Sequence, residues 1–194
     1  MEAKTPDISR LTHAPPSPFT LRTFAIDGPT TEFRDDAVSI RAPIGAESTC
    51  ILAVHIADVS AVVPQGSLLD TVARLRLQSL YASSSPLHML PPALLHRASL
   101  SEDSPNECLT ALITLDSAGK VRGHELVRSV IGPVRALSYD EVDEVLRGSD
   151  GMDSMVHRDL RKLDLVARRR AGAALRGLQL RAGKSLSGGA LGGT

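Results

Sequence analysis

The stretch CILAVHIADV, residues 50–59, decides the fold that this sequence predicts. It is nearly continuous in apolar residues and rich in β-branched ones, a pattern typical of a buried central strand. Residues 23–27 form a second short apolar run, which ends before the turn signal Gly28-Pro29, and residues 37–41 alternate apolar and polar side chains. We therefore expect the front of the chain to form strands that pair around residues 50–59.

Two pairs of residues predict where helices begin. Ser67 with Asp70, and Ser138 with Glu141, have the three-residue spacing of a capping box. The first helix is expected to continue to about Tyr81, because apolar residues recur at helical spacing along it. The second helix is expected to be short.

The remaining segments predict a hairpin and a long basic helix. Residues 109–116 and 121–131 have the pattern of two strands joined near Gly119, and residues 154–180 that of a helix. Together these elements indicate an α+β domain built on a mixed or antiparallel sheet with flanking helices.

The chain divides into three parts. Its 194 residues suit one domain or part of one. Residues 1–22 are rich in proline and are expected to be an extended lead-in. Residues 23–181 carry the domain pattern, and the Gly-rich residues 182–194 are expected to be a disordered tail.

Charge and cysteine content narrow the class of protein. Formal net charge is zero, but residues 158–184 hold nine of the 22 Lys and Arg residues and two of the 22 Asp and Glu residues. That segment is either a solvated helix face or a path for a polyanion beside an acidic body.

Cys50 and Cys108 lack the spacing of a zinc site or a disulfide framework, which favours a reducing compartment. No apolar run reaches the length of a membrane span, which is about 18 residues, and no hydrophobic signal core opens the chain. We expect a cytoplasmic protein, with an organelle as the alternative.

The stretch AIDGPTTEFRDDAVSI, residues 25–40, carries the chemistry. Asp27 ends a strand, Glu32 lies in the following loop, and Asp35 and Asp36 come directly before the next strand. Carboxylates crowded in this way repel one another unless a cation lies between them. Mg²⁺ and Mn²⁺ prefer carboxylate and water oxygens, and a pair of such ions suits phosphodiester hydrolysis. The alternative is a solvated acidic turn, and residue types alone leave both readings open.

This stretch is similar to the active-site signature of the ribonuclease II and ribonuclease R family, the RNB domain. That signature has an Asp, five residues, a second Asp, one residue, and two adjacent Asp before a strand. Asp27, Asp35 and Asp36 match its first, third and fourth acids. Residues 52–73 (with HIADVS), 74–100 and 130–146 resemble later blocks of the family in the same order, and Arg10-Leu11-Thr12-His13 resembles its lead-in.

The resemblance implies an enzyme that degrades single-stranded RNA from its 3′ end and releases nucleoside 5′-monophosphates, with Mg²⁺ or Mn²⁺. It implies that Asp27 and Asp36 hold the metal. It implies that Asp35 is the catalytic carboxylate most critical to hydrolysis, which binds metal or orients the attacking water. Tyr81 would pack against a base near the RNA 3′ end. Apart from the resemblance, Tyr81 could be a core residue at the end of a helix.

The chain also departs from the family. Phe33 stands where the family has its second Asp. Glu32, one residue away, is the alternative to that missing acid, although a one-residue offset changes both the direction and the distance of the side chain. The second half of the family's catalytic domain, with an arginine segment expected to bind phosphate, has no counterpart here, nor do the flanking OB-type domains. We expect a partial RNB catalytic domain with an altered acidic site. The alternatives are a catalytically dead RNA-binding or regulatory relative, and a fragment with no function of its own.

Other polar residues have simpler explanations. His55 lies in an apolar strand and is expected to be a hydrogen-bonded core histidine. Asp58 is expected to cap the turn that follows it. His88 and His96 lack the spacing of a metal site. Arg168 and its two neighbours either contact RNA phosphates or form a solvated helix surface.

Overall fold

A mixed sheet with helices around it forms the core of this chain, in a computed structural model that describes residues 17–41, 49–81, 86–148 and 153–187. Within these residues the strands are β1 (Ser17–Phe19), β2 (Phe24–Asp27), β3 (Asp36–Arg41), β4 (Cys50–Ala57), β5 (Leu80–Tyr81), β6 (Pro86–Leu87), β7 (Asn106–Leu115), β8 (Val121–Ile131) and β9 (Arg135–Ser138). The helices are α1 (Leu68–Arg76), α2 (Pro92–Ala98), α3 (Tyr139–Arg147) and α4 (Ser154–Ser187). The predicted α+β class is confirmed. None of the helices in the described part of the chain is both long and apolar enough to cross a bilayer.

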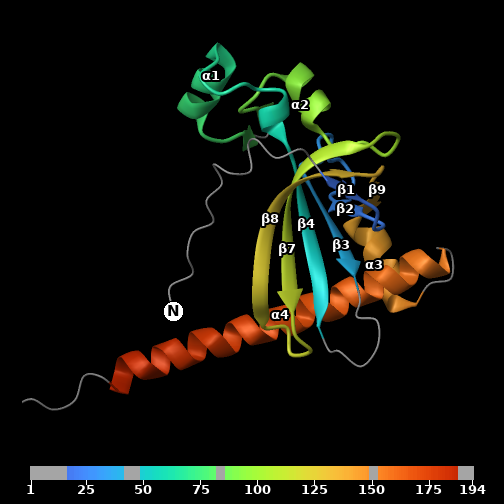
Figure 1. The fold of residues 1–194 in the computed structure, drawn as a ribbon, viewed down its shortest axis with the longest axis vertical. Helices are drawn as coiled ribbons and strands as arrows, with labels where there is room; N and C mark the ends of the chain where they lie inside the picture. The colour runs from blue at the N-terminus through green and yellow to red at the C-terminus, as the bar shows by residue number, and fades with distance from the viewer. Residues whose placement is uncertain (1–16, 42–48, 82–85, 149–152, 188–194) are drawn as a thin grey trace, which may run out of the picture.

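β4 lies at the centre of the sheet, as its apolar sequence predicts. The strand order is β1-β8-β7-β4-β3-β2-β9 (Figure 1). β4 pairs antiparallel with β3 and β7, whereas the pairs β1–β8 and β2–β9 are parallel. β1 pairs with Ser129–Ile131 alone, so along Val121–Arg128 the outer edge of β8 has no neighbouring strand among the described residues.

The helices lie at two ends of the sheet. α1 and α2 lie at the end where β4 finishes and β3 begins, and α4 crosses the other end of β7 and β8 (Figure 1). Ile40, Leu115 and Val166 pack together where α4 meets the strands. Gly119, in the turn between β7 and β8, has a φ of +77°, and a Cβ there would lie 2.5 Å from the carbonyl carbon of Arg169. Only glycine therefore allows this turn to approach α4 so closely.

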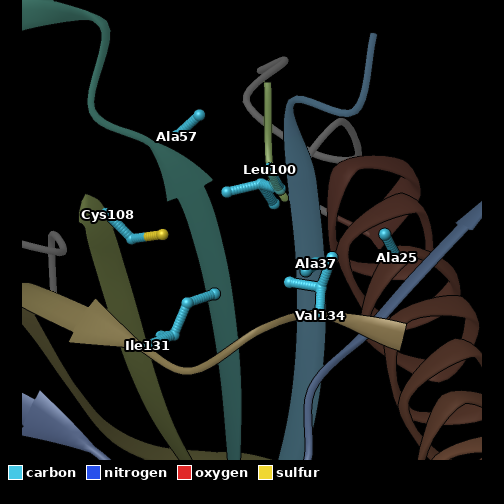
Figure 2. Packing of buried hydrophobic residues seen from close by; sticks show 7 residues of the cluster. All are labelled: Ala25, Ala37, Ala57, Leu100, Cys108, Ile131 and Val134. Carbon is cyan, nitrogen blue, oxygen red and sulfur yellow. The ribbon is translucent and has the colours of Figure 1, made fainter. Parts of the chain in front are cut away.

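A cluster of buried apolar side chains, several of them small, supports the strand ends that carry the aspartates. Ala25 lies two residues before Asp27, and Ala37 directly follows Asp36. Figure 2 shows these alanines with the other members of the cluster, which are Ala57, Leu100, Cys108, Ile131 and Val134. The small side chains of Ala25 and Ala37 let β2 and β3 pack closely against the residues after α2, next to the acidic loop.

The first predicted helix is shorter than its apolar spacing indicates. α1 ends at Arg76 because Leu77 takes a φ of 67° and its amide donates to the carbonyl of Ala73. Leucine gives no sequence signal for this conformation, which glycine usually supplies. Tyr81 therefore lies in β5 and is 80% exposed, so the alternative of a helix-terminal core residue is wrong.

Other boundaries also differ from the prediction. The predicted lead-in contains β1. α2 was not among the predicted helices, and it has proline at its first position. α4 continues to Ser187, so residues 182–187 of the predicted disordered tail are helical. Residues 1–16 and 188–194 lie outside the described residues, so the rest of the lead-in and tail predictions remain predictions.

Candidate functional site: an acidic cleft beside an aromatic cluster

The structure brings the three aspartates of the sequence motif and Tyr81 to one cleft. Asp27 ends β2, Asp35 lies in the loop, and Asp36 opens β3. All three line a cleft of about 480 Å³, together with Tyr81 from β5. The other residues that line it are Thr30, Thr31, Glu32, Phe33, Pro86 and His88. The volume lies within the range of small-molecule pockets, roughly 300–1,000 Å³.

Backbone hydrogen bonds fix the loop that carries the acids. The amide of Thr31 donates to the carbonyl of Gly28 at 3.1 Å, which closes the turn after Asp27. The carbonyl of Asp35 accepts from the amide of Ala57 at 2.9 Å, which ties the start of β3 to the end of β4. The acids therefore lie on a loop anchored at both ends by the sheet.

The carboxylates are close enough to influence one another. Burial raises the pKa of Asp27 above its usual value, and the charge of Asp36 adds to the rise, while that of Arg34 opposes it. Burial also raises the pKa of Asp35, and the charges of Asp36 and Asp27 add to that rise. Repulsion of this kind is what a bound cation relieves.

The donor chemistry fits a hard divalent cation held by few protein ligands. Among the described residues, no three His, Cys, Asp or Glu side chains are gathered as a ready-made metal site. Mg²⁺ commonly binds through one or two carboxylates and keeps several waters, so a cage of three is not required. Asp27, Asp35 and Asp36 supply carboxylate oxygens in one cleft, and a cation there would offset the repulsion between them.

Phe33, at the altered acid position, packs among histidine side chains. Its ring centroid lies 5.4 Å from that of His88 and 4.9 Å from that of His96, both in edge-on contacts. Tyr81 makes a similar contact with His88, at 6.2 Å. The carboxylate of Glu32 lies 3.6 Å from Nε2 of His96. Sequence spacing gave His88 and His96 no role, although the scarcity of aromatic residues, 3% of the chain, makes such a cluster conspicuous.

His55 is a core histidine, as predicted. It is fully buried, Nε2 lies 2.9 Å from Oγ of Ser39, and Nδ1 lies 2.8 Å from Oγ1 of Thr110. Burial lowers the pKa of His55 to about 4, because a charged imidazole is costly in this environment.

Asp58 caps the turn that follows it, as predicted, and has a second partner that the sequence did not indicate. Its carboxylate accepts from the amide of Ser60 at 3.1 Å. The guanidinium of Arg128, from β8, lies 3.0 Å from the same carboxylate.

The predicted basic cluster around Arg168 lies on α4. Arg168 pairs there with Asp164 on an exposed face of the helix.

Comparison with known proteins agrees with this architecture. The family model described as the RNB domain matches residues 19–181. Ribonuclease R of Chlamydia muridarum is 36% identical over 124 residues, which are 63% of this chain and 18% of that protein. The human 3'-5' exoribonuclease HELZ2 is 34% identical over 132 residues, 66% of this chain and 4% of that protein. The chain thus spans less than a fifth of the length of these relatives.

Solved structures share the fold. Mycoplasma genitalium RNase R, in complex with ribose methylated single-stranded RNA, matches with a TM-score of 0.73 and 23% identity, over 86% of this chain and 26% of that one. Yeast Ssd1, described as a pseudonuclease, matches with a TM-score of 0.66 and 23% identity, over 83% of this chain and 19% of that one.

Proposed function

Because this chain belongs to the RNB domain family, we propose that its acidic cleft is the cleavage site of a metal-dependent 3′→5′ exoribonuclease acting on single-stranded RNA. The observation that carries the proposal is that Asp27, Asp35, Asp36 and Tyr81 line the same cleft. Ribonuclease names among the relatives support the reaction class.

The residues have separate roles in this proposal. Asp27 and Asp36 would hold Mg²⁺ or Mn²⁺, and the cation would supply positive charge beside the phosphate that water attacks. Asp35 binds metal or accepts a hydrogen bond from the attacking water and so orients it. Tyr81, largely exposed beside the acids, stacks on a base near the 3′ end without regard to its identity. The product is a nucleoside 5′-monophosphate.

Trimming of a 5′-labelled single-stranded RNA by the full chain, with Mn²⁺, tests the proposal. Asp35→Asn keeps the shape of the side chain but removes its charge, and we expect hydrolysis to fall by about 100-fold or more. Asp143→Asn is the matched control, because Asp143 lies on the exposed surface of α3 and pairs with Arg147. Equal trimming by wild type and Asp35→Asn would contradict the assigned role.

A second candidate is a catalytically dead relative that binds RNA. Phe33 favours it, because its ring stands at an acid position of the family signature and packs against two imidazoles. A pseudonuclease also shares the fold. This candidate predicts that the wild-type chain binds single-stranded RNA without trimming it, and that Phe33→Asp restores trimming. Trimming by the wild type at a rate that Phe33→Asp leaves unchanged would exclude it.

A further inference from the structure

The cleft combines two groups of side chains that act on different parts of a nucleotide: one group repels its phosphate, and the other attracts its base. Asp27, Asp35 and Asp36 supply negative charge, which repels a phosphate unless a cation lies between them. Phe33, Tyr81 and His88 supply aromatic and imidazole rings to the same cleft. A nucleobase is flat and uncharged, so the rings can attract it while the acids exert little force on it.

The rings are arranged so that they do not stack face to face on one another. The planes of Phe33 and His88 meet at 90°, and those of Tyr81 and His88 at 82°. His96 contacts Phe33 from outside the set of residues that line the cleft, at an interplanar angle of 71°. These edge contacts hold the Phe33 ring in place, and the largely exposed Tyr81 ring remains open to a ligand.

We propose that Phe33 is a nucleobase-binding residue, which with Tyr81 and His88 holds the 3′-terminal base of single-stranded RNA in the cleft without a divalent cation. The substitution of an acid by Phe33 therefore changes how the RNA end is held, from contact through its phosphate to contact through its base. This inference rests on the proposed function only in that RNA enters the cleft. It holds whether or not the RNA is hydrolysed.

The test uses the full chain in EDTA and an RNA carrying the fluorescent base 2-aminopurine at its 3′ end. Anisotropy reports binding, and quenching of 2-aminopurine reports stacking. Phe33→Leu keeps the apolar bulk and removes the ring, so we expect quenching to decrease, with Tyr81 still present, and binding to weaken about tenfold. Phe33→Tyr should behave as the wild type. Leu68→Ala is the control, because Leu68 is exposed on α1 and does not line the cleft.

A second measurement needs only the wild-type chain. Quenching should be strong for 2-aminopurine at the 3′ end and weak at an internal position, and an RNA that lacks its terminal base should bind about tenfold more weakly. Quenching that Phe33→Leu leaves unchanged, or that is equal at both positions, would overturn the inference while RNA binding stands. A wild-type chain with no anisotropy change in EDTA would also overturn the inference, while trimming in Mn²⁺ would still test the proposed function. Binding with terminal quenching but no trimming in Mn²⁺ would support the inference and reject the exonuclease proposal.

Discussion

The main-chain amide of Arg34 donates a hydrogen bond to Oγ of Ser99 across 2.9 Å, which joins two segments 65 positions apart in the sequence. The amide of Leu100 donates to the carbonyl of Arg34 at 2.8 Å. The residue directly before Asp35 is therefore held on both sides by the segment that follows α2.

Removing the Ser99 hydroxyl should loosen the acidic loop. Ser99→Ala leaves the Arg34 amide without its side-chain acceptor, and we expect a loss of about 1 kcal/mol in the free energy of unfolding. Faster hydrogen exchange at the amides of residues 33–36 should accompany it, and Ser99→Thr should restore both. Ser101→Ala is the control, because its Oγ accepts from the exposed amide of Asp103. Equal exchange rates in both alanine variants would show that the bond does not hold the loop.

Gly119 should tolerate no side chain. Gly119→Ala combines a left-handed backbone with a Cβ 2.5 Å from the main chain of α4, and we expect it to cost more than about 2 kcal/mol of stability. Gly66→Ala has nearly the same φ, +78°, but nothing lies within 4 Å of its Cβ, so about 1 kcal/mol of backbone strain is expected. Urea unfolding of the two variants separates the contact from the strain. A similar loss in both would mean that the turn can move away from α4.

Stability should fall on mild acidification because of His55. Its pKa is about 4 in the folded chain, against 6.5 for an ordinary histidine, so the unfolded chain binds a proton first as pH falls. The stabilisation is complete above about pH 6.5 and is lost progressively toward pH 4, by up to about 3 kcal/mol. Unfolding free energies across this range should show a smaller slope in His55→Asn than in the wild type. His124→Asn, on exposed β8, is the control, and the same flattening there would rule out His55 as the cause.

Buried and exposed ion pairs of this chain should contribute differently to the free energy of unfolding. Arg128→Leu leaves the carboxylate of Asp58, which is 9% exposed, without its cation, and we expect a loss of about 2 kcal/mol. Arg147→Leu breaks an exposed pair with Asp143 on α3, and we expect less than about 0.5 kcal/mol. Thermal or urea unfolding of both variants measures the difference. Losses of the same size would mean that water reaches Asp58 as freely as it reaches Asp143.

Local signals in the sequence predicted the elements that local interactions form. The capping box of Ser138 and Glu141 is present, and both side chains make their expected hydrogen bonds. The hairpin around Gly119 and the central strand β4 also follow from residue pattern. The end of α1 at Leu77 was not predictable, because the positive φ of a leucine is imposed by the surrounding structure rather than by its own preference.

The acidic residues of the candidate site were evident in one continuous motif, but their neighbours were not. Ser99, His88 and His96 reach the acidic loop from segments more than fifty residues away. Such contacts depend on how α2 and β6 pack against the loop, and no periodicity or spacing within either segment encodes them.

Along most of its outer edge β8 has no neighbouring strand in the part of the chain that the structure describes, and this has a consequence for how the molecule behaves in a crowded solution. Amides and carbonyls along Val121–Arg128 on that side have no partner strand among the described residues, so they could template the addition of a strand from another chain. Arg122, His124 and Glu125 line this segment with exposed polar and charged side chains, and pairing with a strand of another chain would remove part of their hydration. Resistance to edge-to-edge polymerisation therefore depends here on a few ionic side chains.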